Sequence, residues 1–222
     1  MFGLDDQLAG LGDGGAFAVV AVIAMLLGLR HATDPDHLTA VTTLLAGDRG
    51  GARRAGQLGL VWGLGHATAL VVFGVPIVLA DAYVPDAVQT GAETLVGLVI
   101  IALALRLLVR AHRRSHGAPP AVRSRSQAYG IGLVHGMGGS AGVGLLLLAA
   151  IPSRGEALVA LTLFAACTAA SMAAASTTFG FVLGREAVAR RFAAAVPALG
   201  LVSLAFGVWY ALGAVQAVPY VF

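Results

Sequence analysis

Long apolar stretches alternate with short polar segments along the whole chain. Because a helix of about 20 apolar residues crosses the hydrocarbon core of a bilayer, the pattern predicts six membrane-spanning helices. The predicted spans cover residues 16–46, 57–80, 92–110, 128–151, 157–183 and 194–217. We therefore expect an all-α integral membrane protein with a single transmembrane domain, residues 1–222.

The two halves of the chain carry similar short motifs at a nearly constant offset. Gly28-Leu29-Arg30-His31 in the first span matches Gly132-Leu133-Val134-His135 in the fourth, and Gly97-Leu98-Val99 in the third matches Gly200-Leu201-Val202 in the sixth. Since each half has three spans, the second half must be inverted relative to the first, as in many transporters. The sequence predicts an inverted 3+3 repeat with pseudo-repeats 16–110 and 128–217 and a basic cytoplasmic linker, 111–127.

Arginine residues are concentrated in alternate loops. All 14 basic residues are Arg, and twelve of them lie in or beside the loops after the first, third and fifth predicted spans. The other side has Arg154 and most of the acidic residues. Because basic loops stay in the cytoplasm, we expect both termini outside. The absence of Lys and Asn indicates a GC-rich bacterial genome, and hence a bacterial cytoplasmic (inner) membrane.

The composition excludes several classes of protein. Charged residues make up 11% of the chain and hydrophobic residues 58%, whereas soluble domains have roughly 25% charged residues. The single cysteine, Cys167, excludes an internal disulfide and the dithiol relay of cytochrome biogenesis proteins. The net charge of +3 comes from loop arginines and does not indicate a nucleic-acid partner.

Five ionisable residues interrupt the first predicted span within eight positions. The segment reads Arg30-His31-Ala32-Thr33-Asp34-Pro35-Asp36-His37. As one straight helix this span would be roughly 46 Å long, whereas the hydrocarbon core is about 30 Å thick. Pro35 removes a backbone hydrogen bond, and a broken helix in a membrane must face protein or a water-filled cavity. We therefore expect the first helix to be broken here.

The side chains of this segment suit a divalent transition metal. His31, Asp34 and His37 fall within an arc of about 120° on a helix, whereas Asp36 joins them only if Pro35 opens the turn. Imidazole and carboxylate ligands suit nickel, cobalt, zinc or manganese, and the lack of a nearby thiolate disfavours copper(I). An interfacial loop in which these side chains meet water is the alternative, although apolar stretches flank the segment on both sides.

The same segment resembles the signature of the nickel/cobalt transporter family (NiCoT, or NicO), which includes short UreH-type members. That signature is a His, four residues and then Asp-His, usually preceded by Arg. His31, Asp36 and His37 occupy these positions, and Asp34 matches an additional family Asp. The family's second motif, Leu-Gly-His-Ser/Thr, resembles Leu64-Gly65-His66-Ala67, except that Ala67 replaces the hydroxyl residue.

Two further histidines are candidate ligands. The resemblance makes His66 a ligand, and Gly63 and Gly65 beside it permit close helix approach; the alternative is a buried core histidine. His135 begins a glycine-rich segment similar to the His-Gly stretch of short UreH-type members. Glycine there predicts that the fourth helix is broken as well. A packing residue at a small-residue interface is the alternative role of His135.

The resemblance implies a secondary transporter, in the direction of uptake, and not an enzyme. The transported Ni²⁺ or Co²⁺ would be held near the membrane midplane without any prosthetic group. The candidate metal-binding residues are His31, Asp34, Asp36, His37, His66 and His135. Partners are the lipid bilayer and the ion, while a homo-oligomer and a link to cytoplasmic metallochaperones stay open. No ATP-binding motif of the Gly-x4-Gly-Lys-Ser/Thr kind is present.

Other functional classes stay open at this point. An amino-acid or anion exporter of the lysine-exporter or sulfite-exporter type could share the inverted plan, but it does not require two His and two Asp in one broken helix. An intramembrane serine protease would use Ser140 in a Gly-x-Ser-x-Gly frame. Its base is missing from the sixth span, and His135 lies about 140° around a helix from Ser140. Glu93 is interpreted as a carboxylate at a helix N-terminus, where the helix dipole favours it.

Overall fold

The computed structural model describes residues 4–45, 50–80, 86–115, 124–137 and 151–219. These residues form α1 (Leu4–His31), α2 (Pro35–Leu45), α3 (Gly51–Ala80), α4 (Asp86–Ser115), α5 (Arg125–His135), α7 (Arg154–Leu183) and α8 (Glu186–Ala214). The described part of the chain contains no strand, and the predicted all-helical class is confirmed.

Four helical segments are long and apolar enough to cross a membrane: Gly51–Ala80, Ala87–Arg113, Arg154–Leu183 and Glu186–Ala214. The pair Phe17–His31 and Pro35–Thr42 forms a fifth candidate span that bends by 43° at its break. Many large apolar side chains are exposed on these helices, among them Leu98, Leu201 and Val202, which suits a surface covered by lipid. The chain is therefore a multi-pass helical membrane protein.

The predicted break in the first span is confirmed, whereas the fourth span is only partly described. Of its expected range, 128–151, the structure shows α5 up to His135 and a turn at 136–137. Residues 138–150, with Ser140 and most of the glycine-rich segment, lie outside the described residues. The other predicted spans correspond to α3, α4, α7 and α8, each of which begins several residues earlier than predicted.

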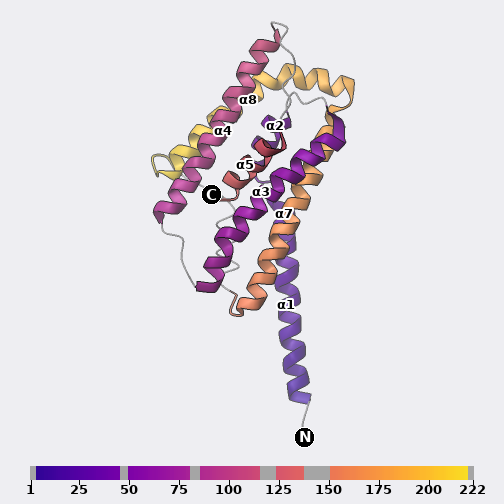
Figure 1. Ribbon diagram of the computed structural model, residues 1–222, viewed down its shortest axis with the longest axis vertical. Helices are drawn as coiled ribbons and strands as arrows, with labels where there is room; N and C mark the ends of the chain where they lie inside the picture. The colour runs from indigo at the N-terminus through magenta and orange to yellow at the C-terminus, as the bar shows by residue number, and fades with distance from the viewer. Residues whose placement is uncertain (1–3, 46–49, 81–85, 116–123, 138–150, 220–222) are drawn as a thin grey trace.

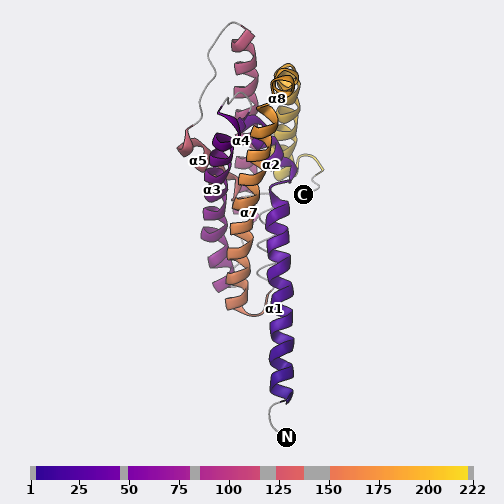
Figure 2. The ribbon, with the colours of Figure 1, turned by 90° about the vertical axis from the view of Figure 1, so that its right-hand side faces the viewer.

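The helix α3 lies between α5 and α7 (Figure 2). Figure 2 shows α5, α3, α7 and α1 side by side in that order, and α3 contacts both α5 and α7 while α1 contacts α7. The helices α4 and α8 form a second closely packed pair, and α3 runs opposite to α7 (Figure 1). The N-terminal part of α1 extends beyond the other helices in both views.

Glycines allow α3 to approach both neighbours closely. A Cβ atom on Gly63 would lie 2.7 Å from the Cα of Ala169 in α7. On the other side, a Cβ on Gly65 would collide with the backbone oxygen of Tyr129 in α5, and one on Gly132 of α5 would collide with α3. Small residues are typical of helix interfaces in membranes, where they permit backbone contact. This packing brings His66, next to Gly65, against the end of α5.

Candidate metal site

A break between α1 and α2 positions two histidines of the site. In a continuous helix the residue at Pro35 would donate an N–H to the His31 carbonyl, which proline cannot do. That carbonyl instead accepts from the Asp34 N–H at 3.2 Å, and α2 then begins with Pro35 at its first position, a favoured place for proline. His31 therefore ends one helix and His37 lies in the first turn of the next, with ring centroids 4.4 Å apart.

The third histidine comes from α3. One nitrogen each of His31, His37 and His66 lies within 4.8 Å of the others, a spacing at which the three could hold a metal ion. The closest pair is His31 Nε2 and His66 Nε2, at 2.9 Å. All three side chains are buried, with exposures of 4%, 1% and 0%. This burial disagrees with the interfacial-loop alternative, in which the same side chains would meet water.

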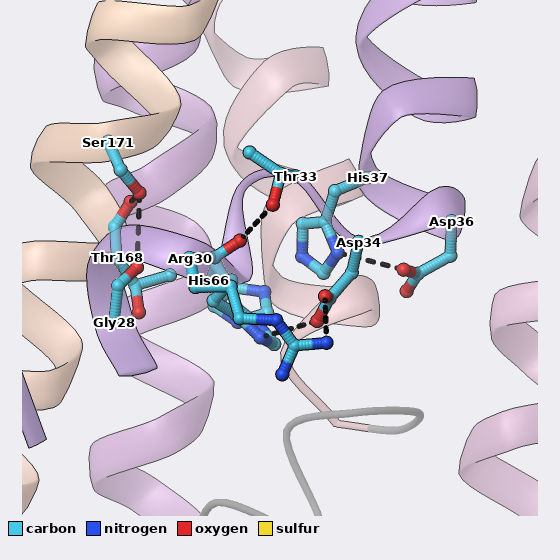
Figure 3. A network of polar contacts seen from close by, with 10 residues as sticks. Gly28, Arg30, Thr33, Asp34, Asp36, His37, His66, Thr168 and Ser171 are labelled. Carbon is cyan, nitrogen blue, oxygen red and sulfur yellow. Dashed lines mark hydrogen bonds and ion pairs between the residues drawn. The ribbon is translucent and has the colours of Figure 1, made fainter. Parts of the chain in front are cut away.

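Carboxylates lie behind two of the rings and orient them (Figure 3). Asp34 Oδ2 is 3.2 Å from His31 Nδ1, and Asp36 Oδ1 is 3.0 Å from His37 Nδ1. In the neutral rings each Nδ1–H then donates to its carboxylate, so the lone pair lies on Nε2. Such second-sphere carboxylates fix the tautomer and orientation of metal-binding histidines. The two aspartates are thus placed to support the imidazoles, not beside the three nitrogens themselves.

The hydrogen bond between His31 and His66 defines the tautomer of the third ring, that of His66. Since His31 Nε2 carries no proton in this arrangement, His66 Nε2–H must be the donor of the 2.9 Å bond. His66 Nδ1 and His37 Nε2 are buried and have no hydrogen-bond partner within the described part of the chain. Unsatisfied buried polar atoms are costly and call for an explanation. A cation among the rings would provide one.

The two carboxylates differ in their partners other than histidine. Asp34 Oδ1 also lies 3.7 Å from the exposed Arg30 guanidinium. Asp36, in contrast, has its Oδ2 buried without a hydrogen-bond partner among the described residues. It lies in the first turn of α2, where the helix dipole favours an anion. A cation beside the imidazoles would therefore stabilise the Asp36 carboxylate.

His135 lies at the edge of this group. It ends α5, its ring is fully buried, and its centroid is 5.4 Å from that of His37. Neither ring nitrogen has a hydrogen-bond partner in the ranges that the structure describes. The structure thus brings His31, His37 and His66 together, places Asp34 and Asp36 behind two of their rings, and leaves His135 one ring away.

Comparison with known proteins agrees with this geometry. Residues 17–117, which contain the helix break and all three clustered histidines, match the NicO family, described as "High-affinity nickel-transport protein". The similarity to the NicO family covers this part of the chain. The resemblance found in the sequence is thereby confirmed.

Two relatives extend the comparison. The urease accessory protein UreH of Bacillus sp. (strain TB-90) is 28% identical over 210 residues, covering 86% of this chain and 90% of UreH. The cobalt transport protein NhlF of Rhodococcus rhodochrous is 34% identical over 96 residues, covering 42% of this chain and 27% of NhlF. The chain therefore matches about a quarter of NhlF but nearly the whole of UreH. No solved structure matches this chain.

Two aromatic residues that the sequence did not indicate cover the histidine cluster. The ring centroid of Trp62 lies 5.6 Å from that of His37, and the centroid of Phe164 lies 5.6 Å from that of His31. Trp62 precedes His66 by one helical turn, so spacing along α3 could have indicated it. Phe164 comes from α7, and no local signal connects it with the site. Both rings replace water around the imidazoles with apolar surface.

The interpretation of Glu93 as a helix N-terminal residue is wrong. α4 begins at Asp86, so Glu93 lies in its third turn, where it is buried and accepts a hydrogen bond from Gln89 Nε2 at 3.1 Å. The predicted span begins at residue 92, whereas α4 begins six residues earlier. Glu93 is thus a buried carboxylate with an amide partner, and not a capping group.

Proposed function

We propose that this protein is a secondary transporter that takes up Ni²⁺ or Co²⁺ across the bacterial cytoplasmic membrane. One observation carries the proposal: three buried imidazoles from a broken membrane helix and its neighbour each offer a nitrogen within 4.8 Å of the others. The nickel in the family description and the cobalt in the name of NhlF support this choice of ion. Imidazole also suits both metals.

The ion would bind to Nε2 of His31, His37 and His66. Metal–imidazole bonds are about 2.0–2.1 Å long for zinc, a comparable divalent ion, so nitrogens on one ion lie about 3–4 Å apart. The widest spacing in the cluster, up to 4.8 Å, must therefore shrink by about an ångström. His66 must move its proton to Nδ1, which replaces the His31–His66 hydrogen bond with two metal bonds. We assign His135 to a fourth position, and Asp34 and Asp36 to holding the rings and balancing charge.

Packing between α4 and α8 supports the inverted repeat. A Cβ atom on Gly97 would meet Ala211, and one on Gly200 would meet Leu108. These two contacts are related by the same offset of 103 residues that relates Gly97 to Gly200 in the sequence. A two-fold pseudo-symmetry would produce such a reciprocal pair, whereas a chance match of Gly-Leu-Val tripeptides would not.

The metal site supports the same symmetry. The His31 ring lies against Phe164 of α7, and the matching His135 ring lies 6.0 Å from Trp62 of α3. Likewise α1 packs on α7 as α5 packs on α3. The three clustered histidines belong to the first repeat, whereas His135 and Phe164 belong to the second. Rocking of one half against the other would thus open and close the ion site, as in other transporters built from inverted repeats.

The membrane potential is sufficient to drive uptake. Moving one elementary charge across 100 mV changes the free energy by about 2.3 kcal/mol, so a divalent ion gains roughly 4.6 kcal/mol at that potential. Because 1.4 kcal/mol corresponds to a factor of ten, this supports accumulation of roughly a thousandfold. The sequence contains no nucleotide-binding motif of the Walker type that would be needed for ATP-driven transport.

Uptake across a panel of ions tests the proposed function. Cells that produce the protein should accumulate nickel or cobalt several-fold above vector controls at micromolar external metal, and should not accumulate magnesium or calcium, which prefer oxygen ligands. Total cell metal measured by mass spectrometry gives the answer. If instead no ion accumulates and the cells export lysine or sulfite, the exporter alternative replaces the transporter proposed here.

We further propose that the arginine-rich end of the molecule faces the cytoplasm. Figure 1 shows the start of α3, the end of α4 and the junction of α7 with α8 at the same end, and most loop arginines belong to these segments. In a Cys167→Ala background, a membrane-impermeant maleimide should label exposed cysteines placed at Val88 or Gly155 on intact cells, but not at His112 or Glu186. Labelling in the reverse pattern would show that the orientation is inverted.

A further inference from the structure

A basic hollow lies between α4 and α5, away from the histidine cluster. It has a volume of about 450 Å³ and is lined by Leu105, Arg106, Val109, Arg110, Arg113 and Gln127. The three arginines follow one another at i, i+4 and i+7, so they share a face of α4. The described residues that line the hollow include no acidic side chain.

The other wall of the hollow adds to its positive potential. Gln127 lies in the first turn of α5, where its N–H donates to the Ser124 N-cap at 3.2 Å. The N-terminus of a helix carries a partial positive charge that favours anions. Guanidinium groups bind phosphate oxygens in a bidentate manner. The chemistry of the hollow thus fits a phosphate group, bound between a helix of the first half and a helix of the second.

The apolar part of the lining indicates where that phosphate comes from. Leu105 and Val109 lie one turn apart and line the same hollow as the arginines. Both apolar side chains are exposed. A soluble anion would leave these side chains in contact with water, whereas a phospholipid would cover them with its acyl chains. The segment also belongs to the C-terminal end of a membrane-spanning helix, where arginine side chains reach the headgroup level.

We propose that the hollow between α4 and α5 binds the phosphate headgroup of an anionic phospholipid, with Arg106, Arg110 and Arg113 on the headgroup and Leu105 and Val109 along the acyl chains. In the proposed orientation this lipid lies in the cytoplasmic leaflet. The proposal does not depend on metal transport, because no residue of the hollow belongs to the histidine cluster.

Lipid binding to the purified, full-length protein tests this site. Native mass spectrometry would follow titrations with phosphatidylglycerol, with phosphatidylcholine and with soluble glycerol phosphate. The test variant combines Arg106→Gln, Arg110→Gln and Arg113→Gln. The control combines Arg185→Gln, Arg190→Gln and Arg191→Gln, which removes the same charge at the α7–α8 junction, at the same end of the molecule.

Phosphatidylglycerol should bind the test variant at least about tenfold more weakly than the wild type, because each basic residue near a membrane contributes roughly one factor of five. The control should lose less than about twofold, and phosphatidylcholine should bind weakly throughout. Equal losses in both variants would mean diffuse attraction and would overturn the site, as would an unchanged test variant. If glycerol phosphate binds the hollow as tightly as phosphatidylglycerol does, the ligand is a soluble phosphate and not a lipid.

A second variant guards against misfolding or inverted insertion of the first. Lysine in place of Arg106, Arg110 and Arg113 keeps the charge that sets topology but lacks the planar guanidinium fork. It should weaken phosphatidylglycerol binding several-fold, and wild-type affinity would contradict the assigned contacts. Nickel binding, measured in each preparation, reports folding independently of lipid binding. A wild-type protein that binds phosphatidylglycerol but not nickel would count against the transport proposal alone.

Discussion

The His37→Ala variant should accumulate no more nickel or cobalt than cells without the protein. His37 contributes the Nε2 that is buried without a partner among the described residues, and its ring lies next to those of His31, His66 and His135. Loss of a second-sphere partner alone weakens metal binding about 10–100-fold, so loss of a ligand should cost more. Accumulation in cells and calorimetric titration of the purified protein would measure both effects.

Two variants make this result specific. His112→Ala removes an exposed histidine from α4 and should leave uptake unchanged. Asp36→Asn keeps every imidazole but removes the charge that orients His37 through a 3.0 Å contact, so affinity should fall by about 10–100-fold without being abolished. Normal accumulation by His37→Ala would exclude the histidine cluster as the ion site, whatever the other variants do.

The sequence contained enough information to single out the clustered histidines but not to place the carboxylates. The break at Pro35 follows from local chemistry, because proline cannot complete the helical hydrogen bond. The ideal-helix arc grouped Asp34 with the two histidines and set Asp36 apart. In the structure both aspartates instead lie behind imidazoles, since the turn at residues 32–34 changes the direction of every side chain that follows.

Helix neighbours were the part of the fold that the hydrophobic pattern could not predict. Lipid is as apolar as a leucine side chain, so burial of apolar surface does not choose one helix partner over another in a membrane. The pattern therefore located α3, α7 and α8 but did not indicate that α3 lies between α5 and α7. Glycine positions contain that information, and only the structure shows which backbone each glycine meets. Phe164 was missed for the same reason.

Gly132→Ala should destabilise the protein strongly, whereas Gly130→Ala in the same helix should not. A Cβ atom at position 132 would collide with the Trp62 carbonyl oxygen and come within 3.0 Å of the His66 backbone nitrogen, while one at position 130 would meet no atom within 4 Å. Backbone atoms cannot turn aside as a side chain can, so we expect a cost of about 1–3 kcal/mol or more. At position 130, alanine should be neutral or stabilising by up to about 1 kcal/mol.

Thermal unfolding of the two purified variants, together with nickel titration, measures this difference. Displacing α5 from α3 would also move His135 and His66 apart, so Gly132→Ala should lose metal affinity along with stability. The two substitutions add the same methyl group two residues apart in one short helix. Any general effect of alanine on helix propensity or insertion would therefore appear in both. Equal melting temperatures would mean that α5 and α3 are not in backbone contact at Gly132. The position assigned to His135 beside the cluster would then be wrong as well.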